Sequence, residues 1–307
     1  VATRDGFQIE PAFIPTEAKV ALINALGETG LPAIEATSFA SPKAIPALRD
    51  AEEVMRGIAR ASGVTYAALV PNLRGAERAL AAGVDEMNLV MSVSETHNLA
   101  NLRMTREQSF VQLCEVVRAC AGRAAVNVSL ATSFGCPMEG AVPEAEVWRW
   151  VSRVLDAGVS NITLADTTGM AHPAQMARMV GAFRDRWPNA RLTLHLHNTR
   201  GLGLANVLAA LGAGADRFDA SLGGLGGCPY APGATGNVCT EDLVHMLEAM
   251  GYRTGVNLPR LVACARSLPT LVGHEVPGQV AKAGRITDLH PAPVWLAEVR
   301  ANALAKG

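Results

Sequence analysis

Near its middle the chain reads Ala157-Gly158-Val159-Ser160-Asn161-Ile162-Thr163-Leu164-Ala165, and this unit sets the architecture. A glycine that ends a helical segment is followed by a short apolar segment typical of a buried strand. The same order recurs at 30–36, 83–91 and 214–221. Further strands are predicted at 66–70, 125–130 and 191–197, together with a short first strand that ends at residues 2–3. The chain is therefore predicted to contain eight strands.

Amphipathic helical segments separate these strands, for example at 16–26, 105–121 and 144–155. Eight strand–helix units predict an α/β fold, a closed (β/α)8 TIM barrel. An open doubly wound sheet is the alternative, but it usually carries a glycine-rich turn after its first strand, where this chain has Arg4-Asp5-Gly6. We expect one domain over residues 1–307. The barrel would span about 1–257, and a C-terminal extension at about 258–307 would pack on it as one or two extra helices.

Composition excludes several classes of protein. The net charge is −1 over 307 residues, which argues against a nucleic-acid partner or a polybasic membrane patch. We find neither an apolar segment of about 18 residues nor a signal peptide, and the start at Val1 fits a short missing leader. Six cysteines without CxxC spacing are typical of reduced thiols, which predicts a cytoplasmic protein.

Polar residues follow the predicted strands at their carboxyl ends. In a parallel barrel these ends meet at one rim, where the chemistry takes place. Since we expect apolar layers inside the barrel, charges buried near that rim are costly unless they are paired or serve a site. The rim candidates are Arg4, Asp5, Glu35, Ser38, Asn72, Ser92, Glu95, Asp166, His195, His197 and Ser221. Their convergence predicts an active site, although solvated loop residues would give a similar pattern.

A metal site is predicted from His195-Leu196-His197, which ends an alternating segment. Residues i and i+2 of a strand point to the same side, so both imidazoles face one spot. Asp5 would add an anionic oxygen and Asn237 a carbonyl oxygen, a donor set that suits Mg²⁺ or Mn²⁺ better than a thiolate zinc site. Each feature also has an ordinary explanation, because His-x-His can be a plain strand face and both Asp5 and Asn237 can be turn residues.

A glycine-rich segment at 222–236 carries Cys228. Glycines leave the backbone little restrained, which suits a lid, and a thiol on a lid can deliver a proton when the lid closes. A plain flexible loop with an incidental cysteine is the alternative. A phosphate cradle is disfavoured, since no Lys-Ser/Thr pair follows at the required spacing.

Taken together, six blocks of sequence resemble 3-hydroxy-3-methylglutaryl-CoA lyases, which are metal-dependent barrel enzymes. They are TRDGFQ at 3–8, IEATSFASPK at 34–43, GCP at 135–137, HLH at 195–197, GLGGCPYA at 224–231 and GNVCTEDL at 236–243. The resemblance extends from Ala2 to about Leu258. The Cys-Pro-Tyr loop and the later Glu-Asp-Leu are specific to the lyases. The Arg-Asp pair and His-x-His are shared with synthases that make 2-isopropylmalate or homocitrate.

The resemblance implies a carbon–carbon lyase of leucine degradation, which cleaves 3-hydroxy-3-methylglutaryl-CoA to acetoacetate and acetyl-CoA. It implies that a divalent metal, Mg²⁺ or Mn²⁺, is held by Asp5, His195, His197 and Asn237. Arg4 would stabilise the enolate oxygen and Cys228 would protonate the enolate carbon, so that the catalytic residues are Arg4, Asp5, His195 and Cys228. Glu35, Asp166 and Glu241 would orient these groups, and Gln8 and Ser38 would hold the acyl group. The partner is a small-molecule acyl-CoA, and a homo-oligomer is expected.

Three positions depart from the family pattern, namely Ile9, Asn127 and Asn198. They leave the acyl group open, so that citramalyl-CoA or an isoprenoid-derived glutaryl-CoA is an alternative substrate. A Claisen-condensing enzyme of the same superfamily is a second alternative, disfavoured because the chain has no room for the usual regulatory domain. A non-enzymatic barrel that binds a CoA ester is a third.

Overall fold

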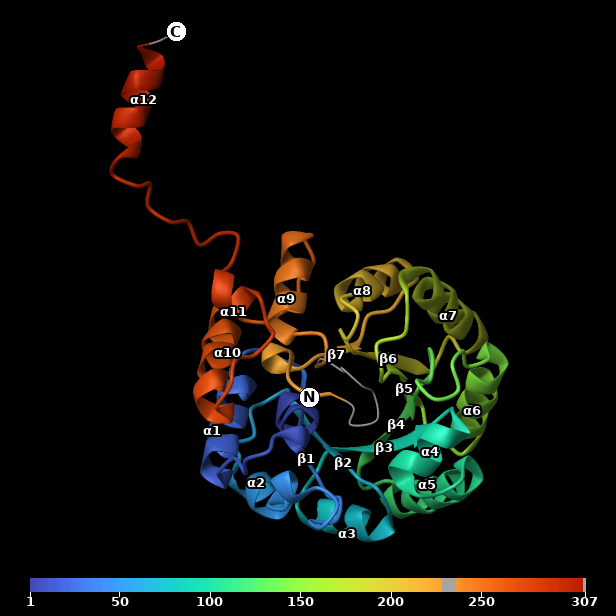
Figure 1. Cartoon of the computed structure of the whole chain (residues 1–307). Helices are drawn as coiled ribbons and strands as arrows, with labels where there is room; N and C mark the ends of the chain where they lie inside the picture. The colour runs from blue at the N-terminus through green and yellow to red at the C-terminus, as the bar shows by residue number, and fades with distance from the viewer. Residues whose placement is uncertain (228–235, 306–307) are drawn as a thin grey trace.

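The structure, a computed structural model, describes residues 1–227 and 236–305, in which parallel strands form one sheet curled into a barrel (Figure 1). Seven strands pair in chain order, each parallel to the next. They are β1 (Ala33–Ser38), β2 (Thr65–Leu69), β3 (Glu86–Ser92), β4 (Ala125–Ala131), β5 (Asn161–Asp166), β6 (Arg191–Leu196) and β7 (Phe218–Asp219). The predicted α/β barrel is confirmed, and the strand after each glycine turn lies close to its predicted range.

Helices surround this sheet (Figure 1). Those that alternate with the strands are α1 (Thr16–Gly27), α2 (Ala51–Gly57), α3 (Leu73–Ala81), α4 (Glu95–Leu102), α5 (Arg106–Cys120), α6 (Glu144–Asp156), α7 (Pro173–Arg186) and α8 (Gly203–Gly212). The chain ends with α9 (Thr240–Ala249), α10 (Leu258–Val272), α11 (Val280–Ala283) and α12 (Leu296–Leu304). Nowhere in the described part of the chain does a helix reach the length and apolarity that crossing a bilayer demands.

The predicted first strand is wrong. Residues Ala2–Gly6 form a π-helical turn, η1, because the N–H groups of Arg4, Asp5 and Gly6 all point to the carbonyl oxygen of Val1. This turn lies between the two ends of the sheet. The Val1 nitrogen donates to the carbonyl oxygen of Ala220 at 2.8 Å, and the Thr3 hydroxyl donates to that of Glu35 at 3.1 Å. In the described residues, η1 thus lies between β7 and β1, where the sequence predicted the first of the eight strands.

The expected apolar layers inside the barrel are also wrong, because the interior carries a layer of hydrogen-bonded polar side chains. The Asn88 Oδ1 atom on β3 accepts from Asn127 Nδ2 and Ser129 Oγ on β4, at 2.8 Å each. Asn127 Nδ2 also donates to Thr163 Oγ1 on β5 at 3.0 Å. All four side chains are buried, and their mutual hydrogen bonds offset the cost of removing them from water.

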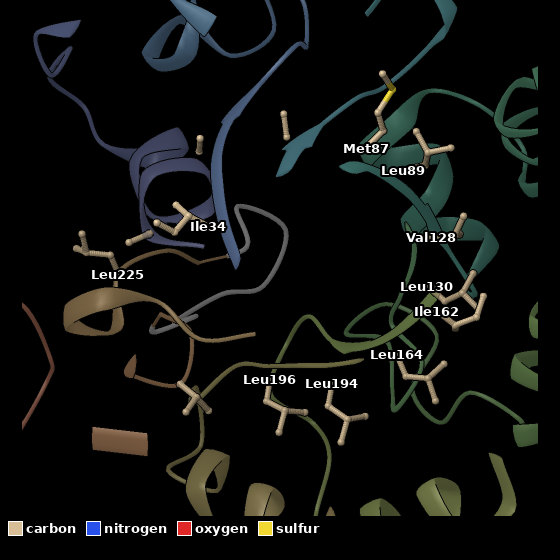
Figure 2. Packing of buried hydrophobic residues seen from close by; sticks show 14 of the residues in the cluster. Ile34, Met87, Leu89, Val128, Leu130, Ile162, Leu164, Leu194, Leu196 and Leu225 are labelled. Carbon is tan, nitrogen blue, oxygen red and sulfur yellow. The ribbon is translucent and has the colours of Figure 1, made fainter. Parts of the chain in front are cut away.

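The apolar residues of the same strands point the other way, toward the helices. Figure 2 shows Ile162 and Leu164 of β5, and Leu194 and Leu196 of β6, directed outward from the ring. They are at most 1% exposed. Burying each such side chain stabilises the fold by roughly 1.5–3 kcal/mol. Strands β3, β4 and β5 therefore have polar side chains on the inner face and apolar side chains on the outer face, and the hydrophobic core lies between sheet and helices.

The C-terminal extension divides into a packed part and a separate part. Helix α10 packs against α1 and α9 and buries residues such as Leu261 and Leu268. Helix α12 has no buried residue, and Figure 1 shows it standing away from the barrel. The residues before it include Pro291 and Pro293, which disfavour helix and favour extended backbone. This differs from the expectation that the whole extension packs on the barrel.

Candidate metal and active site

The side chains predicted as metal ligands come together at one end of the barrel. One ligand atom from each of Asp5, His195 and His197 lies within 4.8 Å of the others. The two imidazole Nε2 atoms are 3.2 Å apart, and His197 Nε2 is 4.0 Å from Asp5 Oδ2. Asn237 joins the group, because its Nδ2 donates to Asp5 Oδ2 at 2.6 Å. Residues separated by more than 200 positions in the chain thus face one point.

Strand β6 and the segment after the glycine-rich loop hold these residues in place. His197 follows β6 and pairs with Asn237 in an isolated bridge, while Val238 donates its N–H to Leu196 O at 2.9 Å. The backbone here leaves no room for larger residues. A Cβ on Gly226, whose φ is +107°, would lie 2.5 Å from Asn237 Nδ2. Glycine at this position therefore lets the backbone of residue 226 lie against Asn237 and Asp5.

The residues present fit a divalent cation. Asn237 Oδ1 is buried and has no hydrogen-bond partner in the described residues. A buried acceptor without a donor is costly, and a cation would satisfy it. Burial alone would raise the pKa of Asp5, but Arg4 and the imidazoles of His195 and His197 outweigh it and lower that pKa to about 2. An ionised carboxylate, two imidazoles and an amide oxygen are ligands suited to Mg²⁺ or Mn²⁺.

Arg4 is buried between two carboxylates. Its Nε donates to Glu35 Oε2 at 2.5 Å, and one terminal nitrogen donates to Asp5 Oδ1 at 2.7 Å. Gln8 Nε2 donates to the same Asp5 oxygen at 2.9 Å. Of the predicted residues, Arg4 and Gln8 therefore contact Asp5 of the ligand cluster, and Glu35 contacts Arg4.

The remaining predicted residues lie farther from the ligands or outside the described residues. Ser38 is buried at the end of β1 and accepts the N–H of Ala40 at 3.2 Å. Glu241 accepts the N–H of Gly223 at the base of the glycine-rich loop, with oxygens at 3.1 and 3.2 Å, and burial raises its pKa. Cys228 lies outside the residues that the structure describes.

Asp166 ends β5 but pairs in register with Leu196 rather than with His195. Since neighbouring residues of a strand face opposite sides, this register places Asp166 on the helix side of the sheet. Its Oδ1 accepts the N–H groups of Met170 and Ala171 at 2.7 and 3.1 Å. Burial raises the pKa of Asp166 to about 6. Asp166 therefore holds the turn after β5 instead of a metal ligand.

The sequence prediction missed Asp219. Its Oδ2 lies 3.3 Å from His195 Nδ1, the ring nitrogen opposite to the one that faces His197. A carboxylate on the second nitrogen fixes the orientation of a metal-binding imidazole. One feature of the sequence could have revealed it: Asp219 is an acidic residue in the predicted strand 218–221, which follows the strand that carries His195.

The comparisons with known proteins agree with this site. The HMGL-like family matches residues 1–268. The chain belongs to this family. A hydroxymethylglutaryl-CoA lyase of Bacillus subtilis is 47% identical over 91% of the chain and 94% of its own length. A hydroxymethylglutaryl-CoA lyase of Acinetobacter baumannii, solved with coenzyme A and 3-methylmalate, is 56% identical with a TM-score of 0.92, covering 95% and 96% of the two chains.

A second kind of relative is also close. An (R)-citramalyl-CoA lyase of Chloroflexus aurantiacus is 39% identical over 93% of the chain and 94% of its own length. Both kinds of relative are lyases named for a CoA thioester, and the hydroxymethylglutaryl-CoA lyases are carbon–carbon lyases.

Proposed function

We propose that this chain is a divalent-metal-dependent lyase that cleaves 3-hydroxy-3-methylglutaryl-CoA to acetoacetate and acetyl-CoA. The observation that carries the proposal is the buried cluster of Asp5, His195 and His197, with the unpartnered Oδ1 of Asn237 beside it. The named relatives, at 47% and 56% identity, support the reaction and the acyl-CoA class of substrate.

We assign the metal to Asp5, His195, His197 and Asn237. When bound, Mg²⁺ or Mn²⁺ would lower the pKa of the substrate hydroxyl. A base at the rim removes the hydroxyl proton, and Asp5 is the candidate for it, because the two ring nitrogens of His195 face the ligand cluster and Asp219. As the carbon–carbon bond breaks, the thioester becomes an enolate. Arg4 places a fixed positive charge where the enolate oxygen gains negative charge, which stabilises the transition state.

The other roles follow from the positions of the side chains. Glu35 orients Arg4 through its hydrogen bond, and Gln8 contacts Asp5. Glu241 anchors the base of the loop that carries Cys228, which we assign as the donor of a proton to the enolate carbon. We propose Gln8 and Ser38 as contacts of the acyl group.

A second candidate substrate is citramalyl-CoA, favoured by the relative from Chloroflexus aurantiacus. Both substrates carry a hydroxyl on the carbon that becomes a carbonyl, so the same residues serve either cleavage. The two differ in the group attached to that carbon. Turnover of both thioesters, measured side by side, decides between them.

The cellular setting is also proposed. Enzymes of this reaction serve leucine degradation, and we place the chain in the cytoplasm as a homo-oligomer. Free thiols support a reducing compartment, namely Cys114, Cys120, Cys136, Cys239 and Cys264 of the described residues. Light scattering of the purified chain tests the oligomeric state.

The central experiment measures acetoacetate and acetyl-CoA formed from 3-hydroxy-3-methylglutaryl-CoA by the full chain. We expect activity to vanish with EDTA and to return with Mn²⁺ or Mg²⁺. Asp5→Ala should lower kcat at least about 1,000-fold, since it removes a ligand and the partner of Arg4. Asp85→Ala is the control, because Asp85 is exposed at the amino-terminal end of β3. Activity that survives both the chelator and Asp5→Ala contradicts the proposal.

A further inference from the structure

We infer that Asn88 is a positioning residue, which holds Glu35 and, through Glu35, the guanidinium of Arg4 in the orientation needed for cleavage. Asn88 lies on β3 inside the barrel and is 6% exposed. It belongs to none of the sequence motifs that point to the active site. The inference rests on the proposed function, since it assigns Asn88 to the same reaction.

The first link runs from Arg4 to Glu35. Arg4 Nε donates to Glu35 Oε2, which leaves Glu35 Oε1 as the second buried oxygen of that carboxylate. Asn88 Nδ2 donates to this Oε1 at 2.9 Å. Because both oxygens of Glu35 then have a donor, its carboxylate plane is fixed from two sides. A fixed carboxylate in turn fixes the plane of the Arg4 guanidinium, which is planar and directional.

The second link fixes the Asn88 amide itself. An asparagine amide can turn over and exchange its oxygen with its nitrogen. Here Asn88 Oδ1 accepts from both Asn127 Nδ2 and Ser129 Oγ at 2.8 Å. The Asn127 donor on one side of the amide and the carboxylate oxygen of Glu35, an acceptor, on the other select the orientation in which the Asn88 oxygen faces Asn127. The nitrogen must therefore point to Glu35.

The third link extends across the barrel to β5. Asn127 Nδ2 donates to Thr163 Oγ1 at 3.0 Å, in addition to its bond to Asn88. The hydrogen bonds thus run from Thr163 through Asn127 and Asn88 to Glu35 and Arg4. They connect β5, β4, β3, β1 and η1. Buried polar chains of this kind fix one arrangement of the side chains when every member is satisfied.

Loss of Asn88 removes the donor to a buried carboxylate oxygen. Glu35 Oε1 would then be buried without a partner, which favours rotation of the carboxyl group. This rotation weakens the hold on Arg4 while the metal ligands keep their own contacts. The expected effect is on kcat, because Arg4 acts on charge that develops in the transition state.

The test compares Asn88→Leu with Asn98→Leu in the full-length enzyme. Asn98 on α4 is a matched control, since it is buried and also makes three hydrogen bonds, to the Ser92 N–H, Met104 O and Ser109 Oγ. We expect Asn88→Leu to lower kcat by about 10–100-fold, with KM and Mn²⁺ affinity changed less than about threefold. Asn98→Leu should lower the melting temperature similarly and leave kcat within about threefold.

A double-mutant cycle with Arg4→Lys separates positioning from general destabilisation. If Asn88 acts through Arg4, Asn88→Leu lowers kcat less than about threefold in the Arg4→Lys background. If Asn88→Leu does not fold, Asn88→Asp takes its place, because Asp keeps acceptors for Asn127 and Ser129 and lacks the donor to Glu35. We expect a loss of kcat of at least the same size from that variant.

The size of the effect should decrease along the chain of hydrogen bonds. Asn127→Leu should cost less kcat than Asn88→Leu, and Thr163→Val should cost less than about threefold. An unchanged kcat in Asn88→Leu and Asn88→Asp overturns the inference, as does an equal loss in the Arg4→Lys background or in Asn98→Leu. If the wild-type chain cleaves no 3-hydroxyacyl-CoA, the proposed function itself fails, a result distinct from these.

Discussion

At the scale of the residue, Asn237 shows most directly what the site is built for. Its Nδ2 donates to two acceptors, Asp5 Oδ2 and Leu225 O, whereas its buried Oδ1 receives no donor in the described residues. The described part of the protein therefore supplies hydrogen-bond partners for the nitrogen of this side chain and none for its oxygen. If Asn237 is a metal ligand as proposed, a bound cation would satisfy this oxygen, and metal binding and folding stability would be coupled.

This coupling predicts a metal-dependent melting temperature. Mn²⁺ at 100 times its Kd should stabilise the wild-type chain by about 2.7 kcal/mol, seen as a rise of several degrees. Asn237→Ala should weaken Mn²⁺ binding at least about tenfold and reduce that rise. Asn72→Ala is the control, since Asn72 caps α3 through the Gly75 N–H. A full rise in Asn237→Ala would exclude Asn237 as a ligand.

A second residue, Asp166, predicts a pH dependence of stability. Its pKa in the fold, about 6, lies above the ordinary 3.8, so the folded state binds the proton more tightly than the unfolded chain. Ionisation above pH 6 thus costs roughly 3 kcal/mol, a cost that disappears as the pH falls toward 4. Asp166→Asn keeps an acceptor for Met170 and Ala171 and removes the charge. In urea unfolding it should be more stable than wild type at pH 7 and equal at pH 4.

At the scale of the element, the two faces of each strand explain what the sequence could and could not predict. The ranges of β1 to β6 were predictable, because glycine turns precede β1, β3 and β5 and short apolar segments mark β2, β4 and β6. The polar interior was missed although Asn88, Asn127 and Thr163 alternate with apolar residues in the sequence. Alternation of polar and apolar residues along a strand does not show which set faces the helices and which set faces the barrel axis. That assignment follows only once the sheet closes into a barrel.

The base of the glycine-rich loop supplies a prediction at the same scale. Glu241 at the start of α9 accepts the N–H of Gly223, so Glu241→Ala releases the loop that carries Cys228. We expect kcat to fall by about tenfold, with Mn²⁺ affinity within about threefold, because no described contact joins Glu241 to a metal ligand. Asp242→Ala is the neighbouring control. Asp242 caps α11 through the N–H groups of Gln279 and Val280, so its loss should lower stability by about 1 kcal/mol and spare kcat.

At the scale of the whole molecule, the sequence predicted the rim site better than the closure of the barrel. Asp5, His195 and His197, which the structure brings together, were predictable as a cluster because His-x-His and the Arg-Asp pair have a fixed spacing and parallel strands bring their ends together. The turn η1 was not predictable, since three of its residues donate their N–H groups to the one carbonyl oxygen of Val1, in a geometry that no periodicity indicates. Asp219 was missed because an acid in a two-residue strand gives little signal.

The exposed helix α12 allows a test of how the chain is divided. Because α12 buries no residue in the described structure, removal of residues 289–307 should leave the melting temperature within about 2 °C and kcat within about twofold. Differential scanning fluorimetry and the lyase assay check both values. Trp295 is 62% exposed, so its fluorescence should also report a solvent environment in the full chain. A large loss in the truncated chain would show that the extension has a structural partner.

The separation of polar and apolar faces bears on how the enzyme can be re-engineered. Randomising outward positions such as Ile162 disturbs the hydrophobic core and selects against folded variants. Inward positions near the rim avoid that penalty when they lie outside the ligand cluster and the hydrogen bonds of Asn88, Asn127 and Thr163, provided that each new polar group finds a hydrogen-bond partner. A combinatorial library restricted to those positions should therefore give a high fraction of soluble clones in which new acyl selectivities can be sought.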